Sequence, residues 1–323
     1  MQLTLKDVAK RLKAAKKIII TSHVIPDGDA VGSSLALRRM LVSLGKEVRV
    51  FIDDSIRKNL ETLPDFDLIE RPMLEEKLDA DLLVILDTQL DRIGQVRQAA
   101  EGIPIINIDH HVTNEGKGVD LYLEENAAAT CEVIYELSKV LKVELDREAA
   151  TCLYTGIATD TGFFNYSNTR PSTLRAAAAL LEAGVKPNEI SEQIEKKSLT
   201  DVMGEIETLQ TTKVFFEGKA VGLFIDAELS KRIDSTEGFI DLVRIIDGVD
   251  VAFLVHCKAE NFCRVSMRSK NVDVSKIAHK LGGGGHVRAA GCSIAAPFEE
   301  AKMIVIHAIG EALNAHLQPS NEK

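Results

Sequence analysis

The run 105–108, apolar except for Asn107, is followed directly by Asp109, His110 and His111, and it constrains the fold of this chain more than any other stretch. A short, mainly apolar run is typical of a strand buried inside a parallel sheet. Open parallel sheets bind their ligands at the carboxyl ends of the strands. Histidine binds metals and transfers protons near neutral pH. The stretch therefore predicts a strand whose carboxyl end belongs to a functional site.

Acidic residues follow two further apolar runs. The β-branched run 17–22 leads into His23 and a turn that carries Asp27 and Asp29, and a third, almost entirely apolar run ends in Asp87. The two aspartates of the turn have an alternative interpretation, because aspartate caps the N-terminus of a helix. The small residues after the turn start such a helix. Both interpretations place the carboxylates at a strand end.

Segments with helical spacing separate the strands, at 35–44, 130–141 and 147–159, and Asp160 follows the last of them. A carboxylate at a helix C-terminus is disfavoured by the dipole, so Asp160 is expected to have a partner. Alternating strands and helices form a parallel sheet covered by helices. One edge of this sheet is expected to collect seven side chains: His23, Asp27, Asp29, Asp87, His110, His111 and Asp160.

So many carboxylates repel one another, and this favours a pair of bound divalent cations. Without cations, protons would be forced onto some of the acids. One shared carboxylate can hold two ions about 3.5–4 Å apart, the spacing used in phosphoryl chemistry. A donor set of imidazoles and carboxylates without thiolate suits Mn²⁺ or a similar ion better than a soft metal. The cluster therefore predicts a dinuclear metal site.

Composition excludes several other classes of protein. The chain has 323 residues and a formal net charge of −10, which argues against binding of long nucleic acids. No apolar stretch approaches the length of a membrane span, and the N-terminus has no signal-peptide core. The five cysteines form no C-x-x-C pair. We expect reduced, buried thiols without disulfides in a cytoplasmic protein that does not associate with membranes.

The second half of the chain predicts a smaller sheet domain. We expect a first domain at 1–187, a helical linker at 188–210 and a second domain at 211–323. In the predicted strand 263–269, Arg268 shares one face with other polar residues. We therefore expect an α/β protein with a parallel-sheet N-terminal domain covered by helices on both faces, a smaller α/β C-terminal domain, and a cleft between them.

A glycine-rich run near the C-terminus suggests an anion site. It contains Gly284, Gly285, His286 and Arg288, and it matches neither the G-x-G-x-x-G nor the P-loop pattern. Backbone amides without a Cβ can approach an anion closely. Arginine suits phosphate geometry, and histidine adds a donor. We expect these four residues to bind substrate, with Arg268 as a second clamp.

These motifs together resemble those of the DHH phosphoesterases. The segments His23-x-x-Pro26-Asp27-x-Asp29, Asp87, Asp109-His110-His111 and Thr159-Asp160-Thr161-Gly162 match the family's motifs in order, and 282–291 resembles the signature of the associated DHHA1 domain. A chain of this length with only these two domains is most similar to the NrnA subgroup. Members of that subgroup degrade very short RNAs and remove the 3′-phosphate of 3′-phosphoadenosine 5′-phosphate (pAp).

The resemblance implies a role for each residue of the site. His23, Asp27 and Asp87 would hold one Mn²⁺, with Asp87 bridging to a second ion. The second ion would be held by Asp29, Asp87, His110 and Asp160, with Mg²⁺ or Co²⁺ as substitutes. His111 would face the phosphate, and Asp109 would support it from behind. The implied mechanism is attack on phosphorus by a metal-activated water. The implied substrates are short oligoribonucleotides, pAp or dinucleotides, and a homodimer is expected by analogy.

Three other functions remain open at this point. A relative that cleaves linear or cyclic dinucleotides, such as pGpG or cyclic di-AMP, would carry the same motifs. A family II inorganic pyrophosphatase shares the N-terminal motifs, but the glycine-rich run argues against it. A non-catalytic nucleotide sensor is disfavoured because every expected ligand is present. Substrate preference and the direction of RNA attack are not determined by these motifs.

Overall fold

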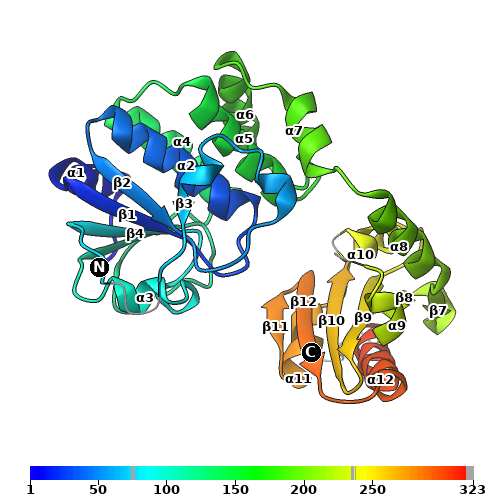
Figure 1. Ribbon diagram of the computed structural model, residues 1–323. Coiled ribbons are helices and arrows are strands. Elements are labelled where there is room, and N and C mark those ends of the chain that lie inside the picture. The colour runs from blue at the N-terminus through cyan, green and yellow to red at the C-terminus, as the bar shows by residue number, and fades with distance from the viewer. Residues whose placement is uncertain (74–76, 234–235, 237, 318–323) are drawn as a thin grey trace, which may run out of the picture. The chain divides into compact units, whose positions relative to one another are not determined.

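The computed structural model describes residues 1–73, 77–233, 236 and 238–317, and it divides the chain into two compact units (Figure 1). The first unit comprises Met1–Lys196 and the second Lys197–Lys323. Each unit has its own sheet and its own core. The two units are described separately below.

A parallel sheet of six strands forms the centre of the first unit, in the order β3-β2-β1-β4-β5-β6. The α/β fold expected from the alternating pattern is confirmed. β3 and β6 were not anticipated, because both are short and only partly buried. The strands are β1 (Lys17–Thr21), β2 (Glu47–Phe51), β3 (Ile69–Glu70), β4 (Leu82–Leu86), β5 (Ile105–Asp109) and β6 (Asp120–Leu123).

Alternate side chains of the strands face two different cores. Ile18 and Ile20 of β1 join the larger core on one face, while Ile19 joins the smaller core on the other. Six helices contribute to the larger core: α1 (Leu5–Ala14), α2 (Gly28–Ser43), α4 (Thr130–Leu141), α5 (Arg147–Asp160), α6 (Pro171–Glu182) and α7 (Pro187–Ile194). The opposite face is covered by η3 (Leu90–Arg92) and α3 (Val96–Ala99). Burial on both faces explains why these strands are almost continuously apolar.

The stretch 188–210, which was expected to be a helical linker, contains residues of two helices, α7 (Pro187–Ile194) and α8 (Leu199–Gln210). α7 and the preceding α6 (Pro171–Glu182) belong to the first unit, and α8 belongs to the second. Pro187 stands at the first turn of α7, where its missing N–H costs nothing. Two short 3₁₀ turns of the first unit are η1 (Lys58–Leu60) and η2 (Phe66–Leu68).

The second unit contains a six-stranded sheet in the order β11-β12-β10-β9-β8-β7. β8 and β9 are parallel, and the other pairs are antiparallel. One face packs against α11 and α12, and the other packs against α9 and α10. The elements are β7 (Lys213–Phe215), η4 (Phe216–Gly218), β8 (Ala220–Ile225), α9 (Ala227–Ser230), α10 (Phe239–Arg244), β9 (Val251–Ala259), β10 (Phe262–Ser269), α11 (Val274–Lys280), β11 (Gly284–His286), β12 (Ala289–Ile294) and α12 (Phe298–Leu317).

The glycine-rich run is more ordered than a loop. Residues Gly284–His286 form β11, which pairs with β12 in a hairpin. A Cβ on Gly283 would lie 2.2 Å from the carbonyl oxygen of Gly291, and one on Gly285 would lie 2.6 Å from that of Ala289. Glycine is therefore required at 283 and 285 because the two strands approach closely.

The expectation that all cysteines are reduced is wrong in this structure. Cys257 and Cys263 form a disulfide between β9 and β10, where the register places them directly opposite each other. Sequence spacing could not show this, because cross-strand pairing depends on register. Cys131, Cys152 and Cys292 are free and buried, as expected.

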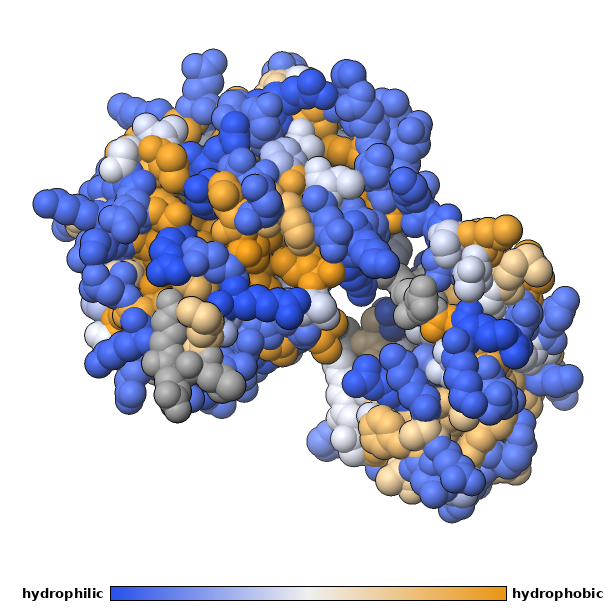
Figure 2. Space-filling view, in the orientation of Figure 1, coloured by the Kyte–Doolittle hydropathy of each residue, from blue (hydrophilic) through white to orange (hydrophobic). Residues whose placement is uncertain are grey.

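Hydrophilic residues cover much of the visible surface of each unit, with smaller apolar areas between them (Figure 2). This agrees with a chain in which 27% of the residues are charged. None of the helices in the described part of the chain combines the length and the apolar character needed to cross a membrane.

Candidate metal centre

The site lies where the strand order of the first sheet reverses. β1 and β4 are neighbours, and the chain builds outward from them in opposite directions. In open α/β sheets, ligands bind at this switch point, outside the carboxyl ends of the strands. His23 follows β1, Asp87 follows β4, and Asp109 ends β5. Three stretches far apart in the sequence are thereby brought to one edge.

His23, Asp27 and Asp87 form the first group of donor atoms. Nε2 of His23 lies 3.5 Å from Oδ2 of Asp87 and 3.9 Å from Oδ2 of Asp27. The other oxygen of Asp27 accepts hydrogen bonds from the backbone N–H groups of Asp29 and Ala30, at 3.1 and 3.0 Å. Asp27 therefore caps α2 with one oxygen and presents the other to the site, so the two interpretations of this residue are compatible.

Asp29, His110 and Asp160 form the second group. Nε2 of His110 lies 3.4 Å from Oδ2 of Asp160 and 3.9 Å from Oδ2 of Asp29. Asp29 is buried at the start of α2, and Asp160 is the last residue of α5. Within each group, one ligand atom per residue lies within 4.8 Å of the others. All six predicted metal ligands therefore lie in two neighbouring groups.

The carboxylate of Asp87 belongs to both surroundings. Its Oδ2 faces His23, and its Oδ1 lies 3.5 Å from Nε2 of His110. Asp87 is buried and has a positive φ of 61°, a conformation that aspartate tolerates better than most residues. Thr130 was not anticipated from the sequence. Its hydroxyl donates to Oδ1 of Asp87 at 3.1 Å, and its backbone N–H donates to Oδ2 of Asp29 at 2.6 Å.

The crowding of charge perturbs these acids strongly. Burial, together with the charges of Asp87 and Asp160, raises the pKa of Asp29 well above its ordinary value. Burial also raises the pKa of Asp160 to about 7, and the charge on Asp87 contributes to this rise. Burial would raise the pKa of Asp87 as well, but the imidazoles of His110 and His23, each 3.5 Å away, lower it below its ordinary value. Repulsion of this kind is relieved by cations.

The imidazoles test whether the residues fit bound cations. Nδ1 of His23 lies 2.9 Å from the carbonyl oxygen of Val24, and Nδ1 of His110 lies 3.3 Å from that of Ala127. A carbonyl oxygen only accepts, so each Nδ1 carries the proton and a neutral ring turns the lone pair of Nε2 toward carboxylates. Nε2 of His110 is buried and has no hydrogen-bond partner among the described residues. A lone pair that faces carboxylate oxygens is repelled by them, and a cation bound between them would remove this repulsion. The residues of the site therefore fit a bound metal ion.

Without cations, protons bound to the imidazoles reduce the repulsion between the lone pairs of Nε2 and the carboxylates. Burial alone would lower the pKa of His110, but the nearby carboxylates of Asp87 and Asp29 raise it to about 10. Burial would likewise lower the pKa of His23, but the nearby carboxylates of Asp87 and Asp27 raise it above its ordinary value. Metal binding at this site must therefore displace protons.

His111 and Asp109 lie beside the two groups. Nδ1 of His111 donates to Oδ1 of Asp109 at 2.8 Å, and it lies 3.6 Å from Oδ1 of Asp87. Asp109 is fully buried, whereas the His111 side chain is 36% exposed. This hydrogen bond leaves Nε2 of His111 available to a ligand. Asp109 therefore holds the His111 ring in place through this hydrogen bond.

Small residues let three helices converge on Asp29. A Cβ on Gly156 of α5 would lie 2.3 Å from Sγ of Cys131 and 2.9 Å from Oδ1 of Asp29. A Cβ on Gly32 of α2 would lie 2.4 Å from the carbonyl oxygen of Cys152. Backbones this close leave no room for a side chain. The position of Asp160 relative to Asp29 therefore depends on glycine in α2 and α5.

The predicted substrate residues lie in the second unit. The register of β10 and β12 places Arg268 opposite Ala289, and the N–H of Ser269 donates to the carbonyl of Arg288 at 3.0 Å. Arg268 and Arg288 are thus brought close in the sheet. Their guanidinium groups donate to the backbone carbonyls of Met267 and Val272, and neither has a carboxylate partner among the described residues. The side chain of His286 lies outside the described part of the structure.

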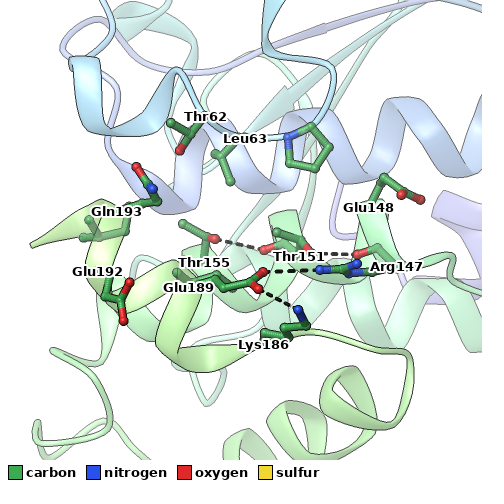
Figure 3. Close-up of a pocket in the computed structure, with 13 residues that line it drawn as sticks. Thr62, Leu63, Arg147, Glu148, Thr151, Thr155, Lys186, Glu189, Glu192 and Gln193 are labelled. Carbon is green, nitrogen blue, oxygen red and sulfur yellow. Dashed lines mark hydrogen bonds and ion pairs between the residues drawn. The ribbon is translucent and has the colours of Figure 1, made fainter. Parts of the chain in front are cut away.

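A cavity of about 410 Å³ in the first unit contains none of the predicted site residues (Figure 3). It lies between the 62–64 segment, α5 and α7. Three of its charged side chains pair with one another: Glu189 accepts from Arg147 at 3.3 Å and from Lys186 at 2.6 Å. The proposed metal ligands lie elsewhere in the first unit.

Comparison with known proteins gives matches across both units. The model of the DHH family, N-terminal domain, matches residues 17–157, and the DHHA1 domain matches residues 221–315. Both the parallel-sheet unit and the second α/β unit are therefore covered.

Several relatives match over almost the whole chain. The bifunctional oligoribonuclease and PAP phosphatase NrnA of Thermus thermophilus is 37% identical over 95% of this chain and 93% of its own length. The protein of the same name from Bacillus subtilis is 29% identical over 86% of this chain and 89% of its own length. A crystal structure of an exopolyphosphatase-related protein from Bacteroides fragilis has a TM-score of 0.89 at 25% identity, with 97% of each chain covered.

Proposed function

The chain belongs to the DHH family, and on that premise we propose that it is a metal-dependent hydrolase of phosphate esters. Its proposed substrates are very short oligoribonucleotides, which it cuts to mononucleotides, and pAp, from which it removes the 3′-phosphate. The names of the NrnA relatives support both activities, because those proteins match over nearly the full length of both partners.

One observation carries the proposal: the Asp87 carboxylate stands between two groups of ligands. One of its oxygens is 3.5 Å from His23, and the other is 3.5 Å from His110. His23 and Asp27 are on one side, and Asp29, His110 and Asp160 are on the other. We assign Asp87 as the bridging ligand of two ions and the other five residues as ligands of one ion each.

Two divalent cations held by these residues would supply an activated water and neutralise charge on the phosphoryl oxygens. The protein's own residues do the rest. Asp109 holds His111 in one orientation through the Nδ1 hydrogen bond. Nε2 of His111 then faces outward, where we assign it to the phosphate that is attacked. The hydroxyl of Thr130 fixes the position of the shared Asp87 carboxylate by donating a hydrogen bond to it.

The donor set supports Mn²⁺ as the resident ion. Two imidazoles and four carboxylates, with no thiolate among the proposed ligands, suit a borderline ion. Mg²⁺ and Co²⁺ are proposed as substitutes.

In the second unit, we propose that Arg268, Arg288, His286, Gly284 and Gly285 bind the rest of the substrate. The two arginines lie close together without acidic partners among the described residues, and they offer planar donor groups that fit a phosphate. A homodimer and a cleft between the domains stay predictions of the family resemblance.

A single comparative assay tests the function. Purified protein with Mn²⁺ is offered pAp, a two-nucleotide RNA, a cyclic dinucleotide and pyrophosphate. We expect turnover of the first two. Exclusive cleavage of the cyclic dinucleotide would establish the alternative diesterase, and exclusive cleavage of pyrophosphate would reject both. Asp87→Ala should abolish turnover, whereas the exposed Asp91, changed to alanine, is the matched control.

A further inference from the structure

Asn114 is a buried amide that no sequence motif singled out. It is 5% exposed, and both ends of its amide are used. Nδ2 donates to Oδ2 of Asp109 at 2.6 Å and to the carbonyl oxygen of Thr88 at 3.2 Å. Oδ1 accepts from the N–H of Gly116 at 3.0 Å. The Gly116 contact requires an oxygen at that end, so the amide has one orientation.

Asn114 completes the hydrogen bonding of the Asp109 carboxylate. Oδ1 of Asp109 accepts from the backbone N–H groups of His110 and His111, at 2.7 and 3.1 Å, and from Nδ1 of His111 at 2.8 Å. Oδ2 receives the Asn114 amide. Asp109 is fully buried, and a buried carboxylate that loses a donor becomes unsatisfied or turns. The plane of this carboxylate therefore depends on Asn114.

The same amide also reaches the strand that carries Asp87. Thr88 follows Asp87 directly, and its carbonyl accepts from Asn114 and, at 2.8 Å, from Nδ2 of Asn107. Among the described contacts, Asn114 also donates to Asp109, whereas Asn107 does not. It therefore ties the end of β4, next to the shared carboxylate, to the group that orients His111.

We propose that Asn114 is a positioning residue: it sets the plane of the Asp109 carboxylate and through it the direction of the His111 imidazole. The inference rests on the proposed function, because it assigns His111 to the phosphate. Asn114 is not one of the six proposed metal ligands, all of which are imidazoles or carboxylates. We therefore expect its loss to change kcat far more than Mn²⁺ binding.

The chain offers a matched control in Asn107. It is a buried asparagine that donates to the same Thr88 carbonyl and makes no described contact with Asp109. Asn114→Ala and Asn107→Ala each remove one buried amide from that carbonyl. We expect both to lower stability, but only Asn114→Ala to lower kcat on pAp and a two-nucleotide RNA. Loss of a supporting contact of this kind costs about 10–100-fold. KM and Mn²⁺ binding measured by calorimetry should change by less than about 3-fold.

A double-mutant cycle with Asp109→Ala tests the route. If Asn114 acts through Asp109, Asn114→Ala causes no further loss of kcat in the Asp109→Ala background. The ¹⁵N shifts of the His111 ring in the Mg²⁺-loaded protein provide a second readout: Asn114→Ala should lose the single tautomer that wild type and Asn107→Ala keep. If Asn114→Ala does not fold, Asn114→Ser replaces it in these measurements. Its hydroxyl can still donate one hydrogen bond, so we expect a kcat below that of wild type but not abolished.

Three outcomes with an active wild type overturn this inference alone. The first is an equal loss of kcat in Asn107→Ala and Asn114→Ala, which would mark a purely structural effect. The second is a full additional loss in the Asp109→Ala background, and the third is an Asn114→Ala variant with unchanged kcat. Wild-type protein that hydrolyses neither substrate would instead reject the proposed function.

Discussion

Metal binding should stabilise the first unit and leave the second unchanged, because all six proposed ligands lie within Met1–Lys196. Each ion held at 100 times its dissociation constant adds about 2.7 kcal/mol to the free energy of unfolding. In a domain of 150–250 residues, each kcal/mol raises Tm by about 2–4 °C. One ion is therefore worth about 5–11 °C, and two ions are worth about twice that.

Three variants show how much each group of ligands contributes to the metal-induced rise in Tm. Asp87→Asn has the same shape but offers one oxygen, so it cannot serve both groups, and the metal-induced shift should be almost lost. Asp160→Asn affects the second group only and should keep about half of the shift. The exposed Asp91→Asn should behave like wild type.

Calorimetry with added Mn²⁺ measures the total shift, and hydrogen exchange resolved by peptide assigns it to a unit. Equal protection of residues 197–317, or a full shift in Asp87→Asn, would refute the assignment of the ligands.

Three further predictions concern packing, pH and substrate. Gly156→Ala should lower the free energy of unfolding by about 1–3 kcal/mol in urea, because its Cβ would lie 2.3 Å from Sγ of Cys131; an unchanged midpoint would contradict the close packing of α5. Burial, followed by the charges of Lys258 and Arg264, lowers the pKa of His256 to about 4. The unfolded chain then binds the extra proton first, so stability is complete above about pH 6.5 and falls by at most about 3 kcal/mol as pH approaches 4; His256→Gln should flatten this part of the urea-midpoint profile. Arg268→Lys should raise KM for pAp by about 10-fold with little change in kcat, because a lysine cannot donate in the planar fork of arginine; an equal fall in kcat would place Arg268 at the reacting phosphate instead.

Local patterns were sufficient for the catalytic edge of the first sheet. The apolar runs before Asp87 and Asp109 predicted β4 and β5, and helical spacing predicted α4 and α5. The parallel topology then required the strand ends to meet, so the two groups of donor atoms could be anticipated from residue types alone.

Contacts that depend on register or on loop conformation were out of reach. Thr130 follows an unremarkable alanine-rich stretch, and its approach to Asp29 and Asp87 arises only when α4 packs beside α2. Asn114 acquires its partners because the chain after His111 brings its amide to Thr88, just past the end of β4. The pairing of Cys257 with Cys263 follows from the β9–β10 register, which no cysteine spacing encodes.

The sequence by itself determined which residues supply the donor atoms, because strand ends and helix starts are set by local hydrophobic periodicity and turn residues. The tertiary structure decided how those atoms are oriented. One oxygen of Asp87 faces His23 and the other faces His110, and one oxygen of Asp109 accepts from His111. Orientation depends on hydrogen bonds between segments distant in the chain, and these exist only after the sheet and its helices have packed.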